Sequence, residues 1–84
     1  MKDEMIVDLQ DIQIRNGKYF IYAQAIVEYY LEYGKVEFTD VYFTNIDVYD
    51  ADDDSGEPLE NFVLTKDEMN ELENTAAKTA VEYF

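Results

Sequence analysis

The stretch MIVDLQDIQIRNGKYFIYAQAIVEYYLEY, residues 5–33, decides the fold of this chain. Its first ten residues alternate between apolar and polar, which is typical of a half-buried β-strand, but the alternation slips once. Two apolar sets therefore fall on opposite faces: Met5, Val7 and Leu9, then Ile12 and Ile14. A β-bulge near Gln10–Asp11 would return both sets to one face, so we predict a bulged strand.

Asn16-Gly17 follows directly and predicts a tight hairpin, because a type I′ turn needs positive φ at both central residues. Residues 18–33 then place a continuous apolar face on a strand: Tyr19, Ile21, Ala23, Ala25, Val27, Tyr29 and Leu31. A helix competes from Tyr22 onward, with Gly34 as its C-cap, because apolar residues there also recur at helical spacing. The hairpin signal and the aromatic content favour a strand.

Residues 35–50 alternate again and predict one strand or two short strands. One face carries Val36, Phe38, Tyr42, Ile46 and Val48. The other carries Glu37, Thr39, Asn45 and Asp47, interrupted by the apolar residues Val41, Phe43 and Tyr49. Residues 50–60 begin with DADDDSGEP, which predicts an acidic surface loop.

The segment LTKDEMNEL, residues 64–72, predicts the start of a helix. Thr65 as N-cap and Glu68 at the third helical position make a capping box, and Leu64 with Met69 makes the matching hydrophobic staple. An apolar stripe then recurs every three or four residues and is expected to face the core: Met69, Leu72, Ala76, Ala80 and Tyr83.

These segments predict one α+β domain spanning residues 1–84. An antiparallel sheet of three to four strands covers about residues 5–50, the acidic loop covers 50–60, and one C-terminal helix at about 66–83 packs on one face of the sheet.

The chain carries 20 acidic and 6 basic residues, which gives a formal net charge of -14 over 84 residues. A folded domain this anionic destabilises its own compact state by self-repulsion, so the charge calls for a reason. The apolar content of 48% is too high for a disordered acidic tail. A core is therefore expected, and dimerisation would help to stabilise a domain of this size.

The sequence contains no histidine and no cysteine, which removes serine triads, thiol nucleophiles, disulfides and the usual zinc ligands. The three glycines stand alone, so no phosphate-binding loop is present. We expect no enzymatic activity and no cofactor.

Asp50, Asp52 and Asp54 match the first, third and fifth ligands of an EF-hand loop. The match then fails, because Ser55 stands in place of the loop glycine and Asn61 in place of the final glutamate. We expect a solvated acidic turn and no metal site; the alternative is calcium or magnesium binding, for which a chelator would shift the melting temperature.

No secretory signal or membrane span is visible, so the expected location is the cytosol. An anionic membrane surface or a nucleic-acid backbone would repel the protein, so we expect neither as a direct partner.

Carboxylates two apart on a strand lie about 6.6 Å apart, and those three or four apart on a helix about 5–6 Å. Such rows resemble the phosphates of a nucleic-acid backbone, and a groove lined with Arg and Lys would accept either. Eight tyrosines exceed what so small a core can bury, and tyrosine is favoured at binding surfaces. The candidate partner-binding residues are Glu28, Tyr30, Glu32, Tyr33, Glu37, Asp52, Asp53 and Asp54.

Both the acidic charge and the tyrosine content also have purely structural uses. Acids at a helix start favour the macrodipole, acids on exposed strands discourage aggregation, and a high negative charge keeps a protein soluble. Tyrosines can also pair across the strands of a sheet. Neither feature taken alone therefore requires a partner.

In layout, a β-hairpin or meander followed by an acidic loop and a capped acidic helix resembles small acidic proteins encoded by bacteriophages. These include anti-CRISPR proteins and DNA mimics that inhibit host machinery. The resemblance implies an inhibitor that acts in the host cell cytosol on the basic surface of a nucleic-acid-binding protein.

The alternative is a homo-oligomeric structural or accessory phage protein, which would form a homodimer through a sheet edge or a tyrosine-rich face. Assembly through apolar contacts would persist in high salt, whereas a mimic would release its target.

Overall fold

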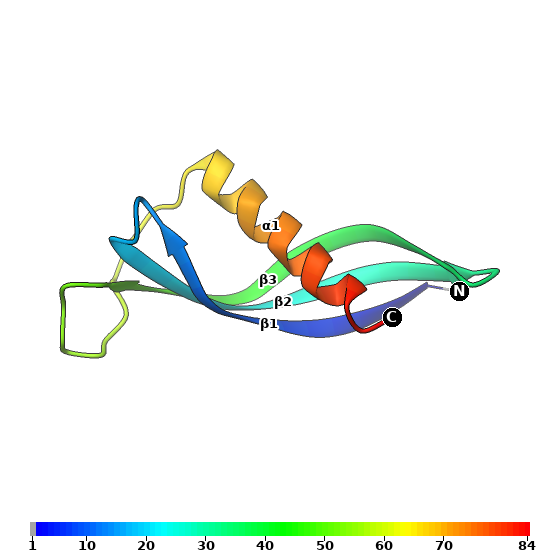
Figure 1. Ribbon diagram of the computed structural model, residues 1–84, viewed down its shortest axis with the longest axis horizontal. Helices are drawn as coiled ribbons and strands as arrows, with labels where there is room; N and C mark the ends of the chain where they lie inside the picture. The colour runs from blue at the N-terminus through cyan, green and yellow to red at the C-terminus, as the bar shows by residue number, and fades with distance from the viewer. Residues whose placement is uncertain (1) are drawn as a thin grey trace.

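The computed structural model describes residues 2–84 as three antiparallel strands followed by one helix (Figure 1). The strands are β1 (Lys2–Ile14), β2 (Tyr19–Glu32) and β3 (Lys35–Asp50), and the helix is α1 (Lys66–Val81). The strand order is β1-β2-β3, so β2 is central and pairs along both of its edges. The predicted α+β fold is confirmed, with three strands in the sheet.

The two strand–turn–strand connections resolve the strand-or-helix alternative for the middle of the chain. Asn16 and Gly17 both have positive φ, 61° and 78°, and the Lys18 amide donates to the Arg15 carbonyl at 3.2 Å. This backbone matches the requirement of the predicted type I′ turn. Gly34, with φ 77°, lies in the turn that leads into β3 and does not cap a helix.

A β-bulge in β1 lies where the alternation slips in the sequence. The pairing with β2 shifts between Leu9 and Ile12, and Asp11 has a φ of 54°. Both apolar sets of β1 consequently point toward the helix, as predicted.

Two further irregularities in β3 were not predicted. The pairing with β2 skips Thr39 and Thr44, and each threonine hydroxyl donates to a carbonyl of β2, that of Glu28 at 3.3 Å and that of Gln24 at 3.2 Å. Each extra residue reverses the alternation that follows it. The prediction that Tyr42 shares a face with Val36 and Val48 is therefore wrong, because Tyr42 pairs with Ile26 on the opposite face.

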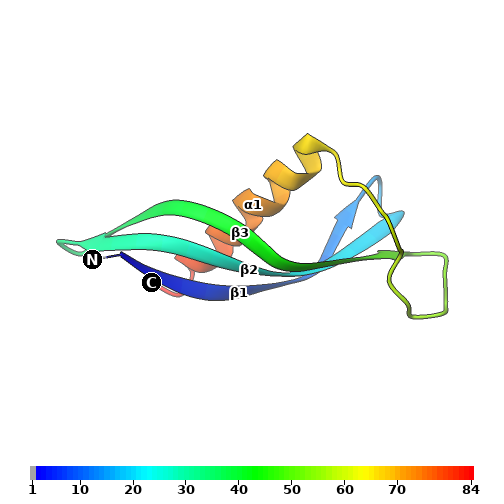
Figure 2. The same ribbon diagram turned by 180° about the vertical axis from the view of Figure 1, so that it is seen from behind.

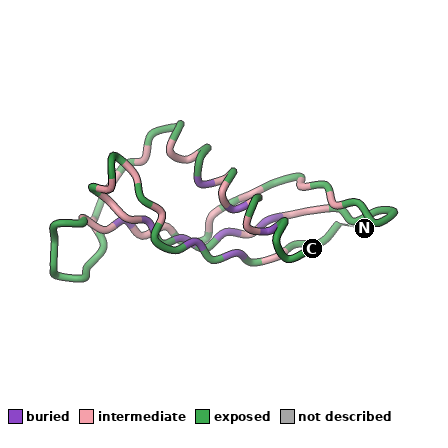
Figure 3. Tube along the Cα trace, in the orientation of Figure 1, coloured by how far each residue is buried: buried purple, intermediate pink, exposed green. Residues whose placement is uncertain are grey.

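The core lies between one face of the sheet and α1 (Figure 3). Its buried members are Val7, Leu9, Ile21, Ala23, Ala25, Val27, Val48, Leu72, Ala76 and Ala80. Alanines on both β2 and α1 are buried, and such small side chains let a helix lie close to a sheet.

The helix ends earlier than predicted. Beyond Val81 the backbone tightens, and the Tyr83 amide donates to the Ala80 carbonyl at 3.1 Å. Tyr83 is 68% exposed, so its assignment to the core stripe is wrong. Leu72, Ala76 and Ala80 are buried as predicted.

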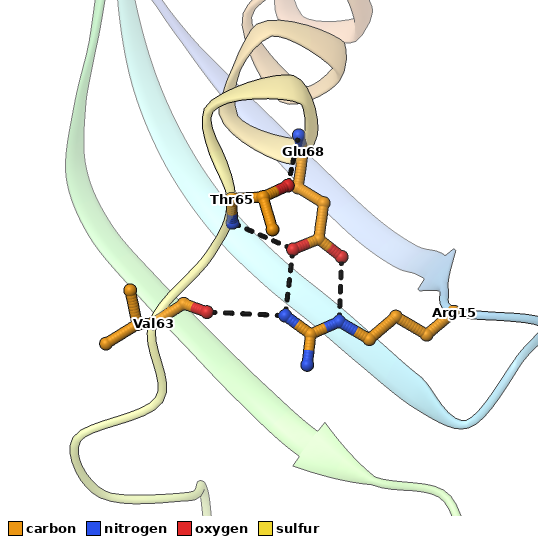
Figure 4. A network of polar contacts seen from close by, with 4 residues as sticks. All are labelled: Arg15, Val63, Thr65 and Glu68. Atoms are coloured by element: carbon orange, nitrogen blue, oxygen red, sulfur yellow. Dashed lines mark hydrogen bonds and ion pairs between the residues drawn. The ribbon is translucent and has the colours of Figure 1, made fainter.

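Arg15, which lies in the β1–β2 turn, binds Glu68 in the first turn of α1 (Figure 4). Thr65 and Glu68 form the predicted capping box, with both reciprocal bonds present. The Arg15 guanidinium binds the Glu68 carboxylate through two hydrogen bonds of 3.0 Å and also donates to the Val63 carbonyl at 3.3 Å. The carboxylate thus serves the helix cap and an ion pair with a residue 53 positions away.

Aromatic rings pack against the same guanidinium. The Cζ atom of Arg15 lies 4.7 Å from the Phe62 ring centroid, and the ring centroids of Phe62 and Tyr19 lie 4.8 Å apart. The hairpin, the segment before the helix and the helix start therefore form one connected cluster.

The molecule is elongated, with extents of 48 × 21 × 20 Å and a radius of gyration of 14.4 Å. A compact domain of this length would have a radius of gyration of about 12 Å. The strands of 13, 14 and 16 residues account for this length. Seen from behind, the sheet lies in front of α1, and no other element within residues 2–84 covers that side (Figure 2).

We predict that the Arg15–Glu68 contact makes stability depend on acid pH. The hydrogen bonds from Arg15, followed by that from the Thr65 backbone, lower the pKa of Glu68 from 4.5 to about 2. A carboxylate with a depressed folded-state pKa stabilises the fold above its unfolded pKa, and this contribution is lost as the pH falls toward the folded pKa. The free energy of unfolding of wild type should therefore exceed that of Glu68→Gln at neutral pH, and the difference should shrink between about pH 5 and pH 2.

Urea titrations at several pH values would measure this difference. Glutamine can still complete a capping box, so the substitution removes the charge and keeps the cap. Glu57→Gln in the exposed loop is the control and should show no such trend. A difference that stays constant down to pH 2 would contradict the assignment.

Candidate functional site: the open face of the sheet

The face of the sheet that points away from α1, here called the open face, collects acidic and aromatic side chains. The register of the strands assigns its residues, because paired residues point to the same side of a sheet. Its acidic members are Glu4, Asp8, Asp11, Glu28, Glu32, Glu37, Asp40 and Asp47. Its basic members are Lys2 and Lys35.

Three of these carboxylates form a row straight across the sheet. Glu4 is paired with Glu28, and Glu28 is paired with Asp40. Directly opposed side chains lie about 4.5–5.5 Å apart at Cβ, and like charges placed so are destabilising. We therefore expect the row to weaken the fold that carries it.

Lys2 partly compensates the middle of this row. Its Nζ atom lies 3.2 Å from the Glu28 carboxylate. The hydrogen bond to Glu28, and then the charge of that carboxylate, raise the pKa of Lys2. Both side chains keep contact with solvent, so this ion pair adds little to stability.

A second polar cluster surrounds Tyr22, about 20 Å from Glu28 along β2 at the usual rise per residue. The Tyr22 hydroxyl donates to the Asp11 carboxylate, and this bond is the largest cause of a raised pKa of Tyr22. The Tyr22 ring meets the Tyr49 ring edge to face, with centroids 5.5 Å apart. Gln24 donates to Asp8 at 3.3 Å next to them.

Apolar side chains lie between these charged groups and remain in contact with water. Tyr22, Tyr30 and Tyr42 are 38%, 39% and 42% exposed, and Ile6 is 64% exposed. Partial burial first, and then the charges of the three-carboxylate row, raise the pKa of Tyr42. Exposed apolar groups gathered on one face of a small protein are typical of an interaction surface.

Two shallow hollows flank Tyr22. One, of about 270 Å³, is lined by Asp8, Gln24, Asn45 and Asp47 among others. The other, of about 410 Å³, lies between Tyr22, Tyr49 and the loop residues Asp53 and Gly56. Both are wide open, whereas small-molecule sites usually enclose most of their ligand. Neither hollow therefore has the enclosed form of a typical small-molecule site.

The predicted partner-binding residues are divided among three places. Glu28, Tyr30, Glu32 and Glu37 lie on the open face. Tyr33 lies fully exposed in the β2–β3 turn, with a φ of 53°. Asp52, Asp53 and Asp54 lie in the loop at the opposite end of the long axis (Figure 1). The predicted set therefore does not form one continuous surface.

The open face also holds acidic and aromatic residues that were not among the predicted partner-binding residues. These are Glu4, Asp8, Asp11, Tyr22, Asp40, Tyr42, Asp47 and Tyr49. For the β1 residues in this list, the sequence did hold a signal, namely the alternation of β1 together with the bulge predicted at Gln10–Asp11. Nothing in the sequence marked Thr39 and Thr44 as extra residues, so the faces were assigned wrongly for the residues between them, whereas those at both ends of β3 were assigned correctly.

Carboxylates of the acidic loop accept hydrogen bonds from backbone amides of the same loop. The Asp52 amide donates to the Asp50 carboxylate and the Ser55 amide to the Asp53 carboxylate, each at 2.9 Å. No group of three or more carboxylates among residues 2–84 is arranged to hold a metal ion.

Within the same residues, no helix combines the length and apolar character needed to cross a membrane.

Comparisons of the chain with protein-family models, curated proteins and solved structures found no match.

We predict that removing one charge from the three-carboxylate row stabilises the protein. Glu4→Gln relieves its repulsion with Glu28 and leaves the ion pair of Glu28 with Lys2 in place. The free energy of unfolding should rise by about 0.2–1 kcal/mol at low salt and by less at high salt, because salt screens exposed charges. Urea denaturation at both salt concentrations would measure the gain.

Glu57→Gln removes the same charge from the loop, where no carboxylate is paired opposite it across a strand, and serves as the control. A Glu4→Gln protein no more stable than this control at low salt would show that the row carries no strain.

Proposed function

We propose that this protein is a non-enzymatic inhibitor that occupies the basic surface of a nucleic-acid-binding protein with its open face. The single observation that carries the proposal is the accumulation of eight carboxylates against two lysines on the side of the sheet that α1 leaves uncovered. Cationic side chains of a target would neutralise the row of Glu4, Glu28 and Asp40, whose mutual repulsion the free protein has to tolerate.

Several acids outside the open face have a local structural purpose. Glu68 and Asp67 lie in the first turn of α1, where they favour the helix macrodipole. Asp50 and Asp53 accept hydrogen bonds from loop amides. In the three-carboxylate row, Asp40 accepts a hydrogen bond from the Val41 amide and Glu28 pairs with Lys2, but neither contact requires carboxylates to oppose one another across the sheet. Solubility alone would be served as well by acids placed farther apart.

The long-range field of this charge also fits the proposed role. A strongly anionic protein is steered toward a cationic groove, and the resulting affinity falls as salt rises. The layout resemblance to phage-encoded inhibitors makes bacterial nucleic-acid-binding proteins the first targets to test.

We predict that the immobilised protein retains nucleic-acid-binding proteins from a bacterial lysate at low salt and releases them in a salt gradient. The Glu4→Gln/Asp40→Asn variant should release the same proteins at lower salt, because it removes two charges from the row and leaves the Lys2–Glu28 pair intact. Mass spectrometry of the eluted fractions would identify the proteins and their elution points.

The matched control is Glu71→Gln/Glu82→Gln, which removes two exposed charges on the helix side of the molecule. It should elute close to wild type. Recovery of no nucleic-acid-binding protein, or equal effects of the two variants, would contradict the proposed function of the open face.

A second candidate function, homo-oligomeric assembly, is favoured by exposed apolar side chains toward the β2–β3 turn and the C-terminus. Leu31, Val81, Tyr83 and Phe84 are 50%, 53%, 68% and 54% exposed. The Phe84 ring packs against the Tyr29 ring, with centroids 5.0 Å apart, so this apolar surface adjoins the core. An oligomer formed there would bury apolar area and keep the open face free.

For this candidate we predict an assembly state that high salt does not change, because apolar contacts are not screened. Leu31→Lys should dissociate the assembly, whereas Val63→Lys, at an exposed residue before the helix start, should not. Sedimentation velocity at low and high salt would measure the state. A monomer under both conditions would exclude the candidate.

A further inference from the structure

Rings and carboxylates alternate on the open face. Along β2, Tyr30 stands between Glu28 and Glu32 on the same side of the strand. Tyr30 is also paired with Glu37 across the sheet, so three carboxylates surround one half-exposed ring.

The same arrangement recurs on β3 and toward the other end of the face. Tyr42 follows Asp40, and Tyr22 is paired with Asp47 and bonded to Asp11. Each of these three exposed rings therefore lies beside carboxylates.

A target that binds duplex nucleic acid mainly contacts the phosphates of a stacked helix, whose base faces are hidden. Carboxylates alone would imitate that surface. Exposed rings and Ile6 would add nothing to such contacts, while their contact with water remains unfavourable.

A target that binds single strands makes a different demand. Such proteins combine a cationic groove that follows the backbone with aromatic platforms on which successive bases stack. An imitator must offer both negative charge and aromatic rings, and the open face supplies carboxylates together with partly exposed tyrosine rings.

We propose that the target of the open face is a protein that binds single-stranded nucleic acid, with the carboxylates in place of phosphates and the rings of Tyr22, Tyr30 and Tyr42 in place of bases. This inference rests on the proposed function and deepens it by naming the class of target. It assigns the tyrosines to the contact with aromatic platforms and the carboxylates to the contact with the cationic groove.

Competition between the protein and labelled oligonucleotides tests the inference. One probe is a bacterial OB-fold single-strand-binding protein with fluorescein-labelled oligo(dT). The other is a duplex-binding architectural protein with a labelled duplex. Fluorescence anisotropy should show that half-displacement of oligo(dT) needs at least about tenfold less protein than half-displacement of the duplex, because each stacked ring adds affinity for the single-strand site alone.

The Tyr30→Ser/Tyr42→Ser variant keeps every charge and should raise the half-displacement concentration for oligo(dT) about tenfold or more. Tyr33→Ser/Tyr83→Ser removes two rings that are more exposed and lie away from the open face, and it should behave as wild type. Thermal unfolding would verify that each variant folds. If the serine pair does not fold, Tyr30→Leu/Tyr42→Leu keeps apolar volume without the flat rings and should show the same loss.

The outcomes separate this inference from the function on which it rests. Equal or stronger displacement of the duplex, or displacement of oligo(dT) that ignores the ring substitutions, overturns the single-strand assignment and leaves the inhibitor proposal standing. Displacement of neither probe, together with no nucleic-acid-binding protein in the lysate experiment, overturns both.

Discussion

The burial of one face of a long three-stranded sheet under a single helix is the constraint on which the rest of the structure depends. Only one side of the sheet can be covered, since α1 is the only helix among residues 2–84. The core residues of all three strands must therefore reach the same side, and three irregularities in the pairing bring this about. As a consequence, the polar and acidic residues of the same strands gather on the other side.

The Arg15–Glu68 contact joins the start of the helix to the hairpin. The sheet and the helix meet mainly through small and aliphatic side chains, which specify the position of a helix along a sheet only weakly. A bidentate ion pair, completed by the capping box and the ring of Phe62, fixes the start of the helix against the hairpin. The open face is therefore one side of a two-layer structure, in which the Arg15–Glu68 contact joins the sheet to the helix.

The carboxylates sort into two groups once their surroundings are known. Some cap a helix, bind Arg15 or satisfy loop amides, and these would be expected in a protein without any partner. Others oppose one another across strands and stand beside exposed rings, which costs stability in the free protein. In proteins, features that cost stability without serving the fold are concentrated at functional sites.

The sequence by itself determined the elements whose signals are local. The Asn16-Gly17 turn, the bulge beside Asp11 and the capping box of Thr65 and Glu68 depend on residues a few positions apart, and all were predicted. The missing histidine and cysteine likewise limit the chemistry without any structure.

Only the tertiary structure decided which acids and rings share a surface. The extra residues Thr39 and Thr44 exist only relative to their partners on β2, and each one moves the following side chains to the other face. Pairing between distant strands, which no local pattern encodes, therefore placed Tyr42 and Asp40 beside Glu28 and Glu4 and sent the acidic loop to the far end of the molecule.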